Sequence, residues 1–287
     1  MNLPPQRILF PFSLVVEHGD GRNAISPGWV FSNSAYTIAR SEEKFATRRK
    51  AKSHSYYTGW KIFRPETINL CIAAREMLRK ASGKKIFFGE KEVEGIGKNA
   101  LTEKSRIAGI KTYTEIVQLY ALRGLLNNVE NGLKQIIERG AFKIQEIPKS
   151  WKNHSNQDNL FSSLNKTAPV TTPLLPWDYD CNEEKLHINT VLILEFNSMI
   201  QSNLMISVPE IVKLLHKLII MEDKFADSVA RSKSKDDYRG KRVIPGYSAA
   251  HINYENDKVV KTSRRKVKQT KSRVEKVEKL LGNLSRL

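Results

Sequence analysis

The acidic cluster at 177–187, WDYDCNEEKLH, holds residue types that could bind a divalent cation. Its candidate ligands are Asp178, Asp180, Glu183, Glu184 and His187. Clustered carboxylates can hold Mg²⁺, and a bound Mg²⁺ can assist cleavage of a phosphodiester. Glu183 and Lys185 also fit the E-x-K half of a common nuclease pattern, but no well-placed partner Asp is evident on an expected strand. We favour a solvated acidic loop and keep a metal-dependent nuclease as an alternative.

The other residues with catalytic or ligating potential are scattered. None of the six His residues has H-x-x-x-H or H-E-x-x-H spacing, and the chain has no G-x-S-x-G motif. Cys71 and Cys181 lie far apart, which is typical of a reducing compartment rather than of a disulfide framework. The stretch GIGKNA at 95–100 offers backbone N–H groups to an anion but lacks the Ser or Thr of a phosphate loop. We therefore expect no catalytic residue, metal or cofactor, and a binding protein more than an enzyme.

The strongest functional signal is the basic segment 258–273, KVVKTSRRKVKQTKSR. Neutralising several phosphates with Lys and Arg releases condensed counterions, which gives affinity that does not depend on sequence. On a helix, Arg264, Lys268 and Lys271 would project together. A solvated basic helix or a localisation signal is the simpler alternative. The cations that we assign to phosphate binding here are Arg264, Arg265, Lys266, Lys268, Lys271 and Arg273.

A second basic segment, 40–64, mixes cations with aromatic rings. Cations can follow a phosphate backbone, and rings can stack on unpaired bases. Alternation along YYTGWKIF (56–63) would bury several of these rings, so ordinary packing competes with stacking. The run RRKAK (48–52) is the firmer phosphate contact. The residues that we assign to nucleic-acid binding here are Arg48, Arg49, Lys50, Lys52, Tyr57, Trp60 and Lys61.

The charge of the whole chain favours a polyanionic partner. Its 287 residues include 48 Lys and Arg against 30 Asp and Glu, a net charge of +18. Such an excess opposes compaction, and nucleic acid is the commonest partner that would neutralise it. A membrane is disfavoured because the basic segment lacks the Trp, Phe or Leu face of membrane-surface helices. The N-terminal apolar run is short and broken by Pro11, so we expect no signal peptide, and no run is long enough to span a membrane.

Apolar patterning predicts alternating strands and helices in the N-terminal half. Apolar, partly β-branched runs predict strands at 7–17, 56–63 and 84–90. Helical spacing predicts helices at 35–53, 66–81 and 112–139, the first capped by Asn33 or Ser34 and the last ended by Gly140. Ala108-Gly109-Ile110 has part of the spacing of a helix-turn-helix, but Lys104 stands where a small residue belongs. We favour an ordinary turn before a helix.

The C-terminal half begins with a Pro-rich stretch, 148–178, that is typical of a linker or long loop. TVLILEF (190–196) fits a strand or a helix equally. Ser207 and Glu210 have the spacing of a capping box and predict a helix to about residue 230. Residues 232–262 look irregular. A terminal helix over 263–284 follows, with an apolar heptad that would face the body or a partner: Val267, Val274, Val277, Leu281 and Leu284.

These elements predict an α+β fold in which helices dominate. We expect a mixed domain at 1–147, a linker or loop at 148–178, a helical part at 179–231 and a basic extension at 232–287 that ends in a helix. From residue 231 onward, 17 Lys or Arg stand against 6 Asp or Glu, so this end carries most of the excess charge.

The leading hypothesis is a non-enzymatic, nucleic-acid-binding subunit of a nucleoprotein assembly. It would contact the phosphate backbone of DNA or RNA and bind other protein subunits, without a membrane. An intracellular location, cytoplasmic or nucleoid-associated, fits such a partner. The alternatives are the nuclease above and a structural protein that pairs through its C-terminal helix, for which the valines would matter more than the cations.

Overall fold

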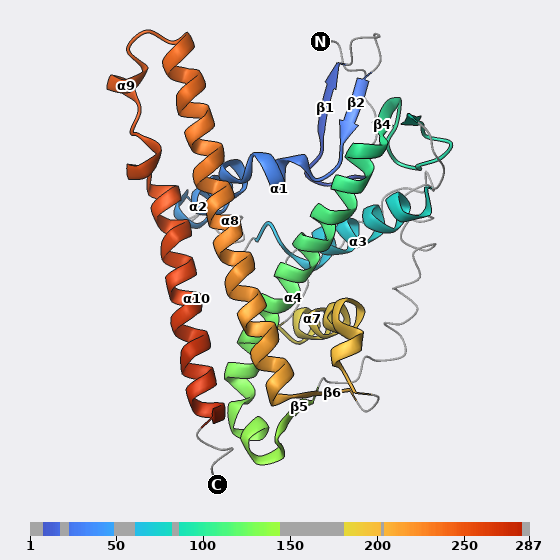
Figure 1. The fold of residues 1–287 in the computed structure, drawn as a ribbon, viewed down its shortest axis with the longest axis vertical. Helices are drawn as coiled ribbons and strands as arrows, with labels where there is room; N and C mark the ends of the chain where they lie inside the picture. Colours follow the sequence, from blue (N-terminus) through green and yellow to red (C-terminus); the bar gives the residue numbers. More distant parts are fainter. Residues whose placement is uncertain are drawn as a thin grey trace. The chain divides into compact units, whose positions relative to one another are not determined.

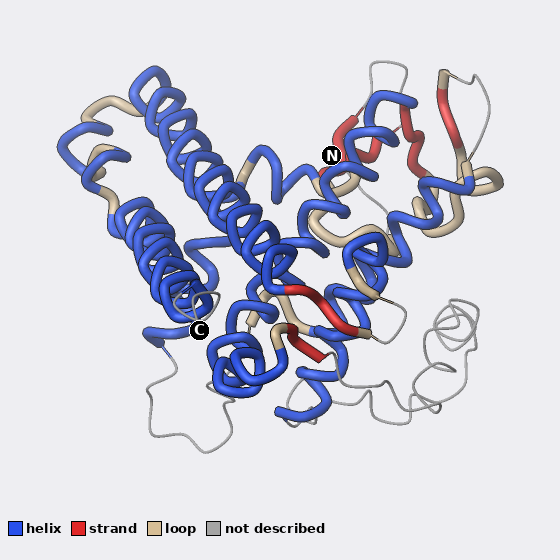
Figure 2. Tube along the Cα trace, turned by 60° about the horizontal axis from the view of Figure 1, so that its bottom comes forward, coloured by secondary structure: helices blue, strands red, loops and turns tan. Residues whose placement is uncertain are grey.

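The structure is a computed structural model that describes residues 8–17, 23–48, 61–81, 86–143, 181–201 and 204–282. These residues form mostly helices and two small sheets (Figures 1 and 2), so the predicted helix-dominated α+β class is confirmed. They fall into two compact units. Unit 1 comprises Met1–Leu119 and Ile219–Ser272, and unit 2 comprises Tyr120–Leu218 and Arg273–Leu287. The expected linker at 148–178 lies outside the described residues, and the domain boundaries stay a prediction.

Unit 1 contains a four-stranded mixed sheet in the order β1-β2-β4-β3. β1 (Leu14–Glu17) pairs antiparallel with β2 (Asn23–Ser26), and β2 pairs parallel with β4 (Asn99–Thr102). β3 (Phe87–Phe88) pairs antiparallel with β4. The strands predicted at 7–17 and 84–90 are therefore present but shorter. The parallel pairing joins distant parts of the sequence, which local patterning does not reveal.

Three helices follow the first hairpin: α1 (Trp29–Asn33), α2 (Ala35–Arg48) and α3 (Pro65–Lys80). α3 has Pro65 at its start, where the missing N–H costs nothing, and its buried Ile68, Cys71 and Leu78 repeat at helical spacing. The helices predicted at 35–53 and 66–81 are thus confirmed over the described residues. The strand predicted at 56–63 is wrong for 61–63, which form no strand because Ile62 and Phe63 both turn into the core.

α4 (Glu103–Arg139) is one continuous helix. It begins earlier than the predicted start at 112 and ends, as predicted, at Gly140, whose φ of 69° is left-handed. Gly109 lies inside the helix, where an added Cβ would crowd Leu78 and Pro27. Both the turn that we favoured there and the helix-turn-helix alternative are therefore wrong, because Ala108 to Ile110 lie within the helix.

Unit 2 holds a two-stranded antiparallel sheet of β5 (Ala141–Lys143) and β6 (Met205–Ser207), with Phe142 opposite Ile206. α7 (Cys181–Phe196) and a 3₁₀ turn, η1 (Asn197–Met199), precede β6. The ambiguous stretch 190–196 is helical. The buried apolar side chains here are spaced three or four residues apart, as in a helix, rather than two apart, as in a strand. They are Ile188, just before the stretch, and Val191, Leu192 and Phe196 within it.

α8 (Val208–Val243) begins at the predicted capping box. The Glu210 carboxylate accepts from the backbone N–H of Ser207 at 3.3 Å and from its hydroxyl at 2.9 Å. The helix runs well beyond residue 230, so the irregular structure expected over 232–262 is wrong for 232–243, and it is also wrong for 258–262, where the terminal helix has already begun. α9 (Tyr247–Ala250) and η2 (Tyr254–Asn256) then lead into α10 (Lys258–Gly282), the predicted terminal helix.

Apart from Val259 at its start, the buried residues of α10 follow a heptad along the helix. They are Val260, Ser263, Val267, Thr270, Val274, Val277 and Leu281. α8 has a matching buried series: Ile211, Leu215, Leu218, Glu222, Phe225, Val229 and Ser232. In unit 1 the two helices run side by side and antiparallel (Figure 1), since Arg264 reaches Asp227 and Asp223. The prediction that the valines face the body or a partner is confirmed, and what they face is this chain.

Candidate functional site

The site residues predicted near the N-terminus fall mostly outside the described residues. These are Arg49, Lys50, Lys52, Tyr57 and Trp60. Arg48 is the last residue of α2, but its side chain is not among those described. Lys61 is described and exposed, and its carbonyl accepts a hydrogen bond from Arg64 at 3.4 Å. The N-terminal half of the site therefore stays a prediction, and the C-terminal half can be built in detail.

Three of the six predicted cations on α10 form ion pairs with carboxylates of the chain itself. Arg264 pairs with Asp227 at 2.5 Å, and Lys266 pairs with Glu42 of α2 at 3.3 Å. Arg273 pairs with Glu130 of α4 at 2.5 Å, which raises the pKa of its guanidinium further. We call Arg264, Lys266 and Arg273 the paired cations. Their positive charge is partly cancelled before any ligand arrives.

The other three predicted cations, Arg265, Lys268 and Lys271, are exposed. None of the described residues forms an ion pair with them. We call these three the open row. Arg265 and Lys268 lie opposite the buried heptad, whereas Arg264 and Lys266 lie on its flanks, close to the acidic side chains of neighbouring helices. Position around the helix thus separates Arg265 and Lys268 from the paired cations, whereas Lys271 lies on the same flank as Arg264 and is open because no described carboxylate pairs with it.

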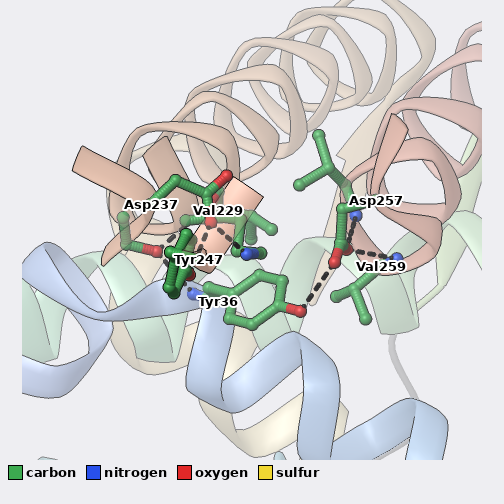
Figure 3. A network of polar contacts seen from close by, with 9 residues as sticks. Tyr36, Val229, Asp237, Tyr247, Asp257 and Val259 are labelled. Atoms are coloured by element: carbon green, nitrogen blue, oxygen red, sulfur yellow. Dashed lines mark hydrogen bonds and ion pairs between the residues drawn. The ribbon is translucent and has the colours of Figure 1, made fainter. Parts of the chain in front are cut away.

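The start of α10 is fixed by a polar network in unit 1 (Figure 3). The Asp257 carboxylate accepts from the backbone N–H groups of Val259 at 2.8 Å and Val260 at 3.2 Å, as a helix cap does. Its other oxygen accepts from the Tyr36 hydroxyl at 2.9 Å, and the Tyr36 backbone N–H donates to the Ser232 hydroxyl at 2.9 Å. Burial and the Asp257 carboxylate raise the pKa of Tyr36, so the phenol stays a donor. α10 is therefore anchored to α2 and α8 within this unit.

The buried heptad leaves little room for the alternative in which α10 pairs with another protein through its valines. Val274 and Val277 are almost fully buried inside unit 2, and Val267 is buried inside unit 1. A partner helix could reach these valines only if α10 detached from the helices that it packs against. The exposed side of α10 is charged, so it offers contacts of another kind.

The acidic cluster at 178–187 is only partly described. Asp178 and Asp180 lie outside the described residues. His187 is buried in unit 2, with its Nδ1 3.0 Å from the Tyr120 hydroxyl, and burial lowers its pKa to about 4. Over the described ranges, no three His, Cys, Asp or Glu side chains come together as a metal site would require. The nuclease alternative gains no support from the residues that can be described.

The backbone loop at 95–100 does present N–H groups to an anion, but the chain supplies that anion. Gly95 and Gly97 have positive φ values of 87° and 64°, and their N–H groups point to the Glu90 carboxylate. Gly95 donates to one oxygen at 2.8 Å and Gly97 to the other at 2.6 Å. A backbone nest that already holds a carboxylate has no room for a phosphate.

One basic surface lies in 232–262, which the sequence pattern predicts as irregular, and it is not among the predicted site residues. α8 continues to Val243, and its last turns expose Arg239, Lys241 and Arg242. The signal was present in the sequence. The heptad that begins at Ile211 continues without interruption to Val229 and Ser232.

Among the helices within the described ranges, none is both long and apolar enough to cross a membrane. The chain matches no protein-family model, no curated protein and no solved structure. The residues and their geometry are therefore the whole basis for inferring a function.

Proposed function

We propose that the chain is a non-enzymatic subunit of a nucleoprotein assembly that binds the phosphate backbone of a nucleic acid through α10. The observation that carries this proposal is the open row, Arg265, Lys268 and Lys271, which is exposed and unpaired with respect to the described residues. The basic segment 40–64 is the second contact that we propose. A compartment that holds nucleic acid, the cytoplasm or the nucleoid, is the corresponding location.

The physical support is the fixed geometry of the row. From Arg265 to Lys271 the helix rises about 9 Å, which corresponds to about three phosphates along one strand of a duplex. Because α10 is packed through its heptad and anchored at Asp257, its backbone is already ordered before binding. Little backbone entropy is then lost when the cations meet phosphates.

The test is a salt titration of binding, measured by fluorescence anisotropy with the full-length protein. Labelled single- and double-stranded DNA and RNA of matched sequence are the ligands, and poly-glutamate is the control polyanion without phosphates. Three phosphate contacts predict a fall of log K with log salt with a slope of about −3 on a duplex, or steeper if other segments contribute. Absence of binding to all four polymers at low ionic strength would contradict the proposal, as would equal binding to poly-glutamate.

A further inference from the structure

The turn between α8 and α10 exposes apolar side chains in an unusual concentration. We call residues 238–252 the hairpin tip; all of them belong to unit 1. Val243 is 77 % exposed, Ile244 51 % and Ile252 67 %. Pro245 follows Ile244 and is also exposed, as is Tyr238. Isolated exposed apolar residues are ordinary, but several of them within one short stretch at the end of a helical hairpin make that stretch a candidate binding surface.

The tip is held in place by specific contacts. Gly240 has no side chain, and the ring of Tyr247 fills the space that a Cβ there would occupy. The Tyr247 hydroxyl donates to Asp237 at 3.0 Å (Figure 3), and Asp237 also pairs with Lys233. The His251 ring stacks on Tyr247 at a centroid distance of 4.2 Å. The apolar residues are therefore presented by a defined turn rather than by a loose loop.

The charge of the tip selects an anionic partner. Arg239, Lys241 and Arg242 are exposed, and the sequence has no acidic residue from 238 to 253. The Arg242 guanidinium lies over the ring of Tyr238, 5.7 Å from its centroid. Apolar side chains flanked by cations are the combination by which proteins insert a wedge between base steps while holding the adjacent phosphates.

We propose that the hairpin tip inserts Val243 and Ile244 between base pairs of double-stranded DNA and bends it. This inference rests on the proposed function and extends it from the side of α10 to its end. Pyrimidine–purine steps would be preferred because they unstack most easily. The tip lies where the chain turns between α8 and α10 (Figure 1), whereas the open row consists of exposed residues further along α10. A bent polymer can contact both, but a flat bilayer would meet only one of them.

The experiment uses full-length protein and a duplex with 2-aminopurine at a single TA step. Base unstacking raises its fluorescence, and energy transfer between dyes at the duplex ends reports bending. The test variant is Val243→Ser with Ile244→Ser. The control is Ile220→Ser, which changes an equally apolar residue of unit 1 that is 68 % exposed on α8.

We expect wild type and Ile220→Ser to raise the fluorescence and shorten the end-to-end distance. The tip variant should do neither, while its affinity falls by roughly threefold or less because phosphate contacts supply most of the binding. If wild type binds the duplex in a salt-dependent manner but neither unstacks nor bends it, the proposed insertion of the tip is wrong and the proposed function still stands. No binding at all overturns both. A third outcome would also overturn the inference and assign the tip to a membrane. In that case the protein floats with phosphatidylserine vesicles only when Val243 and Ile244 are present, while unstacking and bending of the DNA are the same without them.

Discussion

Arg264 on α10 and Asp227 on α8 form an ion pair with a nitrogen–oxygen distance of 2.5 Å. Asp223, one turn earlier on α8, lies 3.7 Å from the same guanidinium. The next residue along the chain, Arg265, is exposed and forms no ion pair with a described residue. The basic run is therefore not a free tail: some of its cations are engaged by carboxylates of the chain and others are open. Exposed pairs of this kind contribute little stability, about 1 kcal/mol at most, so their larger effect is on what the cations can bind.

Removing the carboxylate should make Arg264 available to phosphate. Asp227→Asn combined with Asp223→Asn is expected to tighten binding of nucleic acid and steepen the salt slope by about 0.9, the value for one additional phosphate contact. Glu138→Gln is the control, because it removes an exposed negative charge in unit 2. Anisotropy titrations of the variants against one duplex make the comparison. Equal slopes for wild type and the double variant would mean that Arg264 never reaches a phosphate.

The heptad should account for the attachment of α10. Val274 is fully buried, and Val274→Ala removes two carbon atoms and leaves a cavity, so the free energy of unfolding should fall by about 2–3 kcal/mol. Ile220→Ala, at an exposed position of α8, should cost less than about 0.5 kcal/mol. Urea unfolding followed by circular dichroism measures both. A Val274→Ala variant as stable as wild type would show that this side of α10 is not buried in solution.

The protein should be more stable with glycine than with alanine at position 240, although alanine is normally preferred inside a helix. Alanine gains about 1 kcal/mol in a helix interior, but a Cβ at 240 overlaps the Tyr247 ring and would break its hydrogen bond to Asp237. Overpacking costs about 1–3 kcal/mol, so Gly240→Ala should be destabilising on balance. Gly132→Ala is the matched control, since its nearest contact would be an ordinary 3.9 Å, and it should stabilise the chain. Thermal unfolding distinguishes the two, and a rise in Tm for both variants would contradict the packing of the tip.

His187 should make unit 2 sensitive to acid. Burial lowers the pKa of its imidazole from 6.5 to about 4. The unfolded chain therefore binds a proton at higher pH than the folded chain, and stability is lost as pH falls from about 6.5 towards 4, by about 3 kcal/mol in total. His187→Gln cannot titrate and should lack this contribution. Unfolding free energies of both proteins measured at several pH values give the difference, and parallel curves would exclude a buried neutral His187.

Much of the helical structure could be predicted from local patterns. The apolar spacing of 66–81 and the capping box of Ser207 and Glu210 predicted two helices, and the valine heptad predicted α10. These signals work because helical hydrogen bonds and caps join residues close in sequence. The short strands were harder to predict. β2 pairs with β4, which lies more than seventy residues away in the sequence, and this pairing determines where each of the two strands begins and ends.

The candidate site was predictable as a basic run but not as two sets of cations. Whether a lysine or arginine of α10 is open or paired depends on acidic residues such as Glu42 and Glu130, which are far from α10 in sequence. Only tertiary packing brings them together. The same holds for the loop at 95–100, where the anion that occupies the backbone donors is Glu90.

The comparison of open and paired cations tests the central claim most directly. Arg265→Gln with Lys268→Gln and Arg264→Gln with Lys266→Gln each remove one Arg and one Lys from the same stretch of α10, so the net charge changes equally. Salt titrations on one duplex should give a slope shallower by about 1.8 for the first variant, because two phosphate contacts are lost. The second should change the slope much less, because its cations are already neutralised by carboxylates. If the two variants lose affinity and slope equally, net charge rather than the open row of α10 governs binding, and the account given for this surface is wrong.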